Sequence, residues 1–457
     1  MSPVTWHRAT TEDMDTIYAL SSGALPAGVG IVRISGPESG MALHALAGGW
    51  PEPRRAVVRA LVDPKSRDVI DEALVLWMPG PGTFTGEDTV ELHCHGSRAV
   101  IARLIESLAQ WPGLRMAEPG EFARRAFLNG RLDLTEAEGL ADLVAAETEA
   151  QRRQALSQAR GALAERLLAW RETLLGCVAE VEAQLDFSDE GDVGSEVEVA
   201  SRLRGVLLEV REVLSGARLA ERIRDGFVIV LVGAPNAGKS TLLNAFARRD
   251  VAIVSAEPGT TRDLVTVPLE LSGYALTLID TAGLRETGSA VEAEGVRRAR
   301  LAAEEADLVL ELVPSGQGAL AADAPVTSGG PDRWVIETKA DLVEGGDPLR
   351  GNHRVSAVTG AGLRELELAL GEWLTRQEVG GSSGASGAAP VNARQREGLL
   401  RLAERLESVL KRGQPRGIDE LLGEELRGCL RAVGRVTGEV DPESVLGAIF
   451  GRFCIGK

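Results

Sequence analysis

The chain has 457 residues, 44% of them hydrophobic and 26% charged, a composition typical of globular proteins. Because this length exceeds what one hydrophobic core supports, we expect two or three domains. Its net charge of −17 opposes nonspecific adherence to nucleic acid or to anionic membranes, so any RNA contact must be local. The N-terminal residues resemble neither a signal peptide nor a transit sequence, no apolar run approaches transmembrane length, and the four cysteines lack the spacing of a disulfide framework or a zinc site. We therefore expect a soluble, cytoplasmic protein that does not contact a membrane.

The first 133 residues predict an α+β domain. Short β-rich runs with glycine turns, such as 30–37 and 89–96, predict strands, and residues 99–110 have helical periodicity. From Leu134 to Phe187 the composition changes to Ala, Leu, Glu and Arg without proline, which predicts helix with breaks or close packing at Gly161 or Gly176. Residues 199–224 predict further helix, so the first part of a helical domain covers 134–224.

A phosphate-binding loop opens the next domain, which we place at 225–377. The apolar run 227–232 predicts a strand, residues 233–240 form a glycine-rich loop ending in Lys239 and Ser240, and residues 241–248 predict a helix. Backbone N–H groups and the helix N-terminus would hold an anion, Lys239 would reach the terminal phosphates, and Ser240 would bind Mg²⁺. This order predicts a P-loop α/β nucleotide-binding domain.

Two further segments concern the metal and the γ-phosphate. Residues 276–279 predict a strand that ends in Asp280, whose carboxylate can hold Mg²⁺ through water. The Gly283 amide can sense the γ-phosphate, and Thr261, in the loop 255–263, is the predicted second Mg²⁺ ligand.

The base is identified by the segments that follow. A strand-like run, 334–337, leads to Thr338, Lys339 and Asp341, and Asp341 can accept two hydrogen bonds from guanine that adenine cannot donate. Ser356 and Ala357 resemble the loop whose backbone contacts the guanine oxygen. GTPase families usually carry Asn where this chain has Thr338, so we expect one hydrogen bond fewer between base site and phosphate loop, on the order of 1 kcal/mol.

Hydrolysis requires a group that orients the attacking water. Leu284 follows Gly283, so the glutamine used by Ras-like proteins is absent. The residues alone leave several carboxylates open for this role, although a solvated side chain is the better default for any single one of them: Glu286, Glu292 and Glu294. No arginine finger is recognisable, so a bound cation or a second subunit would neutralise the developing charge.

Residues 378–390, rich in Gly, Ser and Ala, predict a flexible linker, and residues 391–457 contain amphipathic helices again. Helical sequence on both sides of 225–377 predicts that the nucleotide domain is inserted into one helical bundle.

Five segments carry a resemblance to a known family: 15–17, 30–36, 84–88, 119–134 and the C-terminal 453–457. Together they resemble the MnmE (TrmE) family of tRNA-modification GTPases, and the similarity spans nearly the whole chain. The segments near the two ends of the chain distinguish this family from other P-loop proteins, because P-loop domains recur in proteins of many functions.

The resemblance implies a tetrahydrofolate-binding and dimerising N-terminal domain and a homodimer that forms a heterotetramer with the FAD-dependent MnmG (GidA) subunit. The complex would add an aminomethyl or carboxymethylaminomethyl group to C5 of the wobble uridine, position 34, of certain tRNAs. The cofactor would be 5-formyl- or methylene-tetrahydrofolate, and its site would comprise Arg33, Glu91, Arg131 and Lys457, where Arg131 replaces the Lys of some members. The role of Cys454 in the C-terminal segment stays open.

For the GTPase, the resemblance implies that K⁺ takes the place of an arginine finger and bridges dimerising nucleotide domains. Its ligands would be Asn236, Ser255, Glu257 and Thr260. Glu292 matches the carboxylate that orients water, so Glu292 and Lys239 are the predicted catalytic residues. The residues that we expect at the nucleotide are Gly233, Asn236, Ala237, Gly238, Lys239, Ser240, Thr241, Ser255, Thr260, Thr261, Asp280, Gly283, Thr338, Lys339, Asp341, Ser356 and Ala357.

A different class of function shares the middle domain: a switch protein similar to ribosome-assembly GTPases, in which the nucleotide state only controls RNA or ribosome binding. Such a protein would need neither the N-terminal α+β domain nor the C-terminal segment 453–457.

Overall fold

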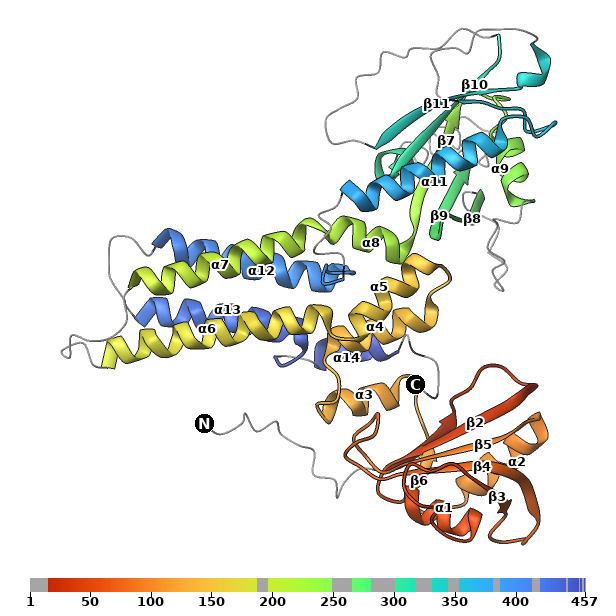
Figure 1. Cartoon of the computed structure of the whole chain (residues 1–457), viewed down its shortest axis with the longest axis vertical. Helices are drawn as coiled ribbons and strands as arrows, with labels where there is room; N and C mark the ends of the chain where they lie inside the picture. The colour runs from red at the N-terminus through yellow and green to blue at the C-terminus, as the bar shows by residue number, and fades with distance from the viewer. Residues whose placement is uncertain are drawn as a thin grey trace, which may run out of the picture. The chain divides into compact units, whose positions relative to one another are not determined.

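The computed structural model describes residues 15–186, 196–248, 265–280, 301–316, 331–343, 353–380, 387–412, 420–440, 443–451, 453 and 456. Its contacts divide the chain into two compact units, each built from segments far apart in sequence. The first unit comprises 1–141, 159–182 and 420–457, and the second comprises 142–158 and 183–419. Each is described here by itself (Figure 1).

The first unit contains a six-stranded sheet in the order β3-β4-β5-β2-β1-β6, antiparallel except for the pair β1–β6. Its strands are β1 (Thr16–Leu20), β2 (Ala27–Ser35), β3 (Val57–Val62), β4 (Val69–Met78), β5 (Thr89–Gly96) and β6 (Leu114–Met116). Together with its helices, this sheet agrees with the α+β prediction for the N-terminal domain.

Side chains alternate between the two faces of this sheet. Val32 and Ile34 of β2 belong to the core beneath α1 (Ser39–Ala47) and α2 (Arg98–Ala109). Arg33, between them, therefore points to the other face. There Phe122, from α3 (Glu121–Leu128), packs with Ile17 and Ala19 of β1.

Four more helices have residues in the first unit: α4 (Leu134–Ala145), α6 (Ala162–Asp186), α13 (Glu420–Thr437) and α14 (Glu443–Phe450). Leu134 of α4, Ala123 of α3 and Phe450 of α14 share one apolar cluster, which packs α14 against α3 and α4. Arg171 of α6 and Glu439 form an ion pair of 3.0 Å.

The second unit contains a six-stranded sheet in the order β12-β11-β10-β7-β9-β8, parallel except for β8. Its strands are β7 (Phe227–Gly233), β8 (Val265–Leu271), β9 (Tyr274–Asp280), β10 (Leu308–Pro314), β11 (Asp332–Thr338) and β12 (His353–Arg354). β7 lies inside the sheet and is buried on both faces, as its continuous apolar sequence predicts. The helices described here are α5 (Glu149–Ala159), α7 (Glu196–Ser215), α8 (Ala217–Asp225), α9 (Lys239–Ala247), the 3₁₀ helix η1 (Ala340–Leu342), α11 (Leu363–Gly380) and α12 (Ala393–Arg412).

The helices of this unit pack in two places. α7 and α12 run side by side in Figure 1 and are linked by an ion pair of 2.6 Å between Arg211 and Glu407. Leu242 of α9 and Leu366 of α11 lie in the core of the second sheet.

The structure confirms one predicted helix break and adds another. The helical stretch that starts at Leu134 is three helices: the predicted break at Gly161 is confirmed, with a left-handed φ of 86°, and a second break, which the sequence analysis missed, lies at 146–148. Thr148 caps α5 there, and Gly176 lies inside α6 without a break. The predicted linker 378–390 is too long, since α11 continues to Gly380 and Ala389 is buried.

Candidate functional site

The phosphate loop follows β7, so it lies at the carboxyl edge of the parallel strands, where ligands bind in open α/β sheets. Gly233 has a φ of 150°, and a Cβ there would lie 2.5 Å from the carbonyl oxygen of Leu312 on β10. Gly238 has a φ of 97° and directly precedes α9. Asn236, exposed in the same loop, also has a left-handed φ of 64°. The loop therefore requires small or conformationally permissive residues where the sequence supplies them.

Lys239 is folded against this loop. Its side chain is buried, and Nζ donates hydrogen bonds to the carbonyl oxygens of Gly233 at 2.7 Å and Ala234 at 3.0 Å. The first N–H groups of α9 lie beside it and lack carbonyl partners within the helix. A buried ammonium group at a helix N-terminus is suited to bind an anionic phosphate.

Ser240 and Asp280 supply oxygens suited to Mg²⁺. Ser240 Oγ donates to Oδ2 of Asp280 at 2.5 Å, which brings the start of α9 to the end of β9. Asp280 is 1% exposed, so β9 fixes its carboxylate at the edge of the phosphate loop. Hard oxygen ligands of this kind fit Mg²⁺, and the predicted pair is thus brought together.

At the base end, Thr338 gives a result that differs from the expectation. Its Oγ1 donates to the carbonyl oxygen of Ala237 at 2.6 Å, and both residues are buried. A hydrogen bond between the base-reading segment and the phosphate loop is therefore present, and the Thr338 hydroxyl donates it. Thr241, one turn into α9, is exposed beside this loop.

Asp341 is positioned by Ser356. Ser356 Oγ, fully buried, donates to Asp341 Oδ1 at 2.6 Å, while Asp341 itself is exposed. Lys339 adopts a left-handed φ of 58° and caps η1, in which Asp341 is the second residue. Ala357 follows Ser356 in the same turn. The predicted base-reading residues therefore converge on one edge of the sheet.

The remaining predicted residues of the nucleotide, potassium and folate sites lie outside the described residues: Ser255, Glu257, Thr260, Thr261, Gly283, Glu292 and Lys457.

The first sheet brings together two of the predicted folate residues. Arg33 and Glu91 face each other across β2 and β5, and Nε and one terminal NH₂ of Arg33 donate to Glu91 Oε1 at 3.1 and 2.9 Å. Glu91 Oε2 lies 3.2 Å from Nε2 of His93. The Arg33 guanidinium also lies over the rings of Phe84 and Phe122. Burial alone would raise the pKa of Glu91, but the charge of Arg33 and the bonds from His93 and Arg33 outweigh it and lower that pKa.

Arg131 and the C-terminal segment reach the neighbourhood of this pair from other elements. The Arg131 stem packs at Gly86, two residues from Phe84. Gly456 approaches β1, where its carbonyl accepts a 2.8 Å hydrogen bond from Ser21 Oγ. The groups gathered at Arg33 are the Glu91 carboxylate, the guanidinium itself and the rings of Phe84 and Phe122, a set that could hold the amino group, anionic tail and ring system of a folate.

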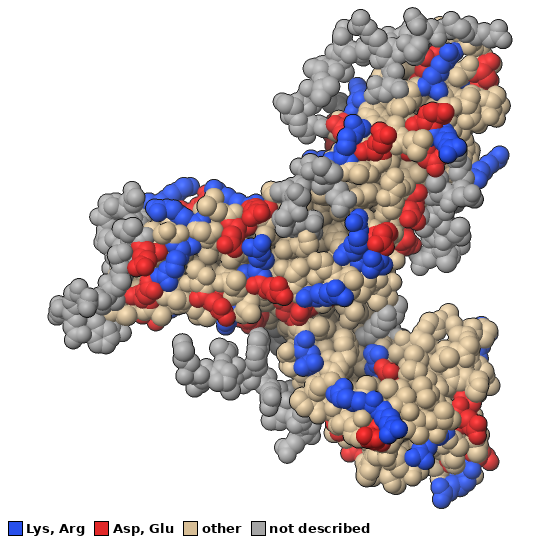
Figure 2. All heavy atoms as spheres, viewed as in Figure 1, with Lys and Arg blue, Asp and Glu red and all other residues tan. Residues whose placement is uncertain are grey.

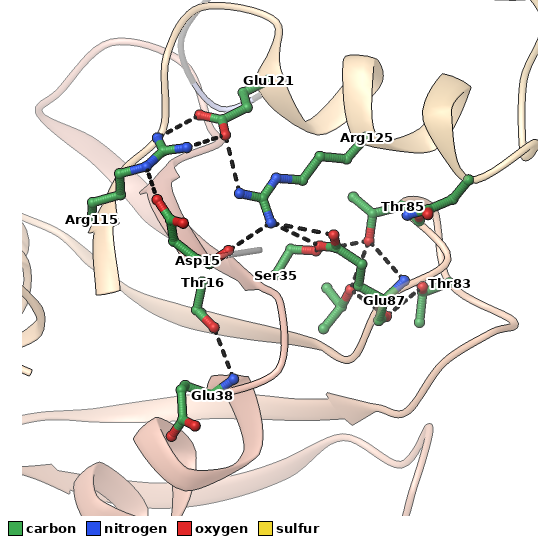
Figure 3. Close-up of polar contacts among 12 residues, drawn as sticks. Asp15, Thr16, Ser35, Glu38, Thr83, Thr85, Glu87, Arg115, Glu121 and Arg125 are labelled. Carbon is green, nitrogen blue, oxygen red and sulfur yellow. Dashed lines mark hydrogen bonds and ion pairs between the residues drawn. The ribbon is translucent and has the colours of Figure 1, made fainter. Parts of the chain in front are cut away.

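A buried charged network beside this face was missed by the sequence analysis (Figure 3). Arg125 of α3 is 4% exposed and pairs with Glu87 at 3.2 Å and with Glu121 at 3.1 Å. Ser35 Oγ donates to Glu87 at 2.6 Å, and Arg115 pairs with Glu121 at 2.6 Å. The network joins α3 and the loop before β5 to β2. Glu87 and Arg125 stand in two of the five segments that carry the family resemblance, 84–88 and 119–134, so that signal pointed to them without giving their roles.

On the face that Figure 2 shows, basic and acidic side chains alternate, and no continuous basic area covers the described residues. Within the described ranges, no helix combines the length and apolar character needed to cross a membrane.

Comparisons with known proteins cover nearly the whole chain. Residues 16–131 match the family described as GTP-binding protein TrmE N-terminus, and residues 134–454 match the MnmE helical domain. A tRNA modification GTPase MnmE of Methylorubrum populi is 50% identical over 97% of this chain and 98% of its own. The protein of the same name from Beijerinckia indica is 48% identical over 99% and 97%. Among solved structures, Era of Aquifex aeolicus bound to GDP and aluminium fluoride is 26% identical over 32% of this chain and 56% of its own, with a TM-score of 0.25.

Proposed function

The chain belongs to the MnmE family of tRNA modification GTPases and is a GTP hydrolase acting in tRNA modification; from this premise we propose that it is the potassium-stimulated GTPase subunit of a complex that modifies C5 of the wobble uridine. Its partners would be a second copy of itself, an FAD-dependent MnmG subunit and the tRNA. The reaction would add an aminomethyl or carboxymethylaminomethyl group at position 34 in the cytoplasm.

The observation that carries the GTPase assignment is the convergence of four short hydrogen-bonded links at one sheet edge. They join Lys239 to Gly233, Ser240 to Asp280, Thr338 to Ala237, and Ser356 to Asp341. The first link fixes a group for the phosphate and the second a group for the metal. The third holds the phosphate loop in position, and the fourth fixes the carboxylate that would read the base.

Within this site Lys239 would bind the terminal phosphates, and Ser240 and Asp280 would hold Mg²⁺, with Thr261 as a further ligand. Bound Mg²⁺ would neutralise phosphate charge. Asp341 would accept hydrogen bonds from guanine with its carboxylate held by Ser356. Asn236, exposed in the loop, would contribute an oxygen to K⁺, and Glu292 would orient the attacking water.

The N-terminal domain would supply the one-carbon unit through a tetrahydrofolate. Glu91 would accept hydrogen bonds from the pterin, and its lowered pKa keeps it ionised for that role. Arg33 holds Glu91 in place, while Arg131 and Lys457 would bind the glutamate tail. Gly456, the residue before Lys457, lies beside the end of β1, where its carbonyl accepts a hydrogen bond from Ser21 Oγ.

The deciding experiment is nucleoside mass spectrometry of total tRNA from cells that lack the protein, complemented with the wild type or with Glu292→Ala. We expect the C5-modified wobble uridine to disappear in the deletion strain and to return only with the wild type. An unchanged nucleoside profile, together with tight ribosome association, would instead identify a ribosome-linked switch.

Binding of 5-formyl-tetrahydrofolate is a second, independent test that distinguishes a tRNA-modifying GTPase from a ribosome-linked switch. We expect calorimetry to detect binding to the full-length protein and its loss in Glu91→Ala. A ribosome-linked switch would bind no folate.

A further inference from the structure

α5 presents three glutamines on one face, at positions three and four residues apart. The side-chain amide of each donates to a backbone carbonyl. Gln151 Nε2 bonds Arg224 at 3.0 Å, Gln154 Nε2 bonds Ala220 at 2.9 Å, and Gln158 Nε2 bonds Ala389 at 2.8 Å.

These carbonyls belong to the two chain segments that flank the nucleotide domain. Ala220 and Arg224 lie on α8, which leads directly into β7 and the phosphate loop. Ala389 lies on the return path, between α11 and α12. α5 is therefore hydrogen-bonded to the chain both where it enters and where it leaves the nucleotide domain (Figure 1).

The same helix is docked on the nucleotide domain itself. Its Ala150 is 5% exposed and belongs to the core of the second sheet, and its N–H donates to the carbonyl oxygen of Gly273 at 3.0 Å. Gly273 lies in the turn between β8 and β9, and the far end of β9 is Asp280, the partner of Ser240. One strand, roughly 20 Å long, thus connects the Mg²⁺ ligands with α5.

Two of these glutamines carry further hydrogen-bond acceptors beside a small cavity, so their hydrogen bonds to the two flanking segments can rearrange. Among the described residues, Gln154 Oε1 and Gln158 Oε1 are buried without a hydrogen-bond partner. Both side chains line a cavity of about 60 Å³, together with Asp142 and Val391. Asp142 is paired with Arg224 at 2.8 Å, so neutral water suits these amide oxygens better than a cation does. Water at this position can replace an amide–carbonyl bond at little cost.

We propose that Gln154 and Gln158 are positioning residues that couple GTP hydrolysis to tRNA modification. They act through backbone carbonyls and touch neither nucleotide nor tRNA. When Asp280 and β9 move with the nucleotide state, the turn at Gly273 moves α5, and the glutamines pass that movement to both flanking segments. The proposal rests on the GTPase and tRNA-modification functions of the family, and on neither the folate nor the potassium site.

The test uses the full-length variants Gln154→Met and Gln158→Met, which keep the side-chain length and remove the amide. Arg152→Gln is the matched control, because Arg152 lies on the same helix and is exposed. Steady-state GTP hydrolysis, tRNA nucleosides in complemented cells and thermal unfolding are measured for each. We expect kcat and KM for GTP within about twofold of the wild type and a loss of at least about tenfold in modified uridine, with the control unchanged.

Hydrogen exchange supplies a readout that a purely structural role would not change. In the wild type we expect peptides covering 220–226 and 387–391 to exchange differently with GDP and with a non-hydrolysable GTP analogue, and this difference to vanish in both variants. Wild-type modification in the variants overturns the proposal. A proportional loss of hydrolysis, modification and melting temperature also overturns it, since the glutamines would then only stabilise the fold. Absence of tRNA modification with the wild-type protein would count against the proposed function instead.

Discussion

The hydroxyl of Thr338 replaces an amide at the base end of the nucleotide site. It reaches the carbonyl of Ala237 at 2.6 Å, beside Gly238, whose left-handed φ of 97° is the conformation that favours glycine. The bond is buried, so its loss would leave a carbonyl without a partner and away from water.

We predict that Thr338→Val weakens GDP and GTP binding by about fivefold or more, since an unsatisfied buried carbonyl costs about 1–3 kcal/mol. Fluorescence titration with a labelled guanine nucleotide measures the change. Thr338→Ser keeps the hydroxyl and should bind nearly as the wild type does. Equal affinities for the valine and serine variants would show that the bond does not support the site.

The lowered pKa of Glu91 predicts a pH dependence of stability. A carboxyl group whose folded pKa lies below its ordinary value of 4.5 contributes stability above that value and loses it as the pH falls through the folded pKa. We expect the unfolding temperature of the wild type to fall below about pH 4.5 more steeply than that of Glu91→Gln. Parallel curves from pH 7 to pH 3 in scanning calorimetry would contradict this.

At the scale of elements, the regular segments and the helix break at Gly161 were predictable, and the break at 146–148 was not. β7 and α9 follow from an apolar run and a glycine loop, and Asp341 follows from its motif. The break before α5 depends on a reciprocal cap between Thr148 and Gln151, whose spacing of three residues was readable but lay within helix-favouring composition. The Arg125–Glu87 pair was not predictable, because it forms between residues 38 apart that only the tertiary fold brings together.

Two glycine substitutions should have opposite effects on helix stability. Gly161→Ala places a Cβ at a φ of 86° and 3.0 Å from Glu136 Oε1, so it should destabilise the first unit by about 1 kcal/mol or more. Gly205→Ala lies inside α7, where a Cβ meets nothing within 4 Å, and should stabilise by about 0.5–1 kcal/mol. Thermal unfolding measures whether each variant melts below or above the wild type. Melting temperatures that both rise or both fall would refute the predicted difference between the two glycines.

Arg125 fastens α3 to the first sheet through two buried carboxylates. Arg125→Met should destabilise this domain by about 3–5 kcal/mol, since it leaves Glu87 and Glu121 without one cation. Urea unfolding followed by tryptophan fluorescence measures the loss. Arg124→Met, at the exposed neighbouring position, should leave the transition within about 0.5 kcal/mol of the wild type.

At the scale of the whole molecule, Gly456 near the C-terminus lies against the end of β1 near the N-terminus. Gly456 has a φ of 99°, and a Cβ there would lie 2.3 Å from the carbonyl oxygen of Leu20. Gly456→Ala should therefore displace this segment from β1, lower folate affinity at least about tenfold, and leave GTP hydrolysis unchanged. Isothermal calorimetry with 5-formyl-tetrahydrofolate measures the affinity.

The matched control is Gly447→Ala in α14, where a Cβ meets nothing within 4 Å and folate binding should persist. Wild-type affinity in Gly456→Ala would show that the segment plays no part in the folate site.

The contact between Ser21 and Gly456 spans 435 residues of sequence. At a translation rate of about 5–20 residues per second, the first strand leaves the ribosome roughly 20–90 seconds before its partner is made. The end of β1 must therefore stay without this contact during synthesis, when a chaperone or a premature partner can reach it. A nascent chain released early would carry complete phosphate and guanine loops while lacking this closure, so the cell could make a molecule that hydrolyses GTP without modifying tRNA.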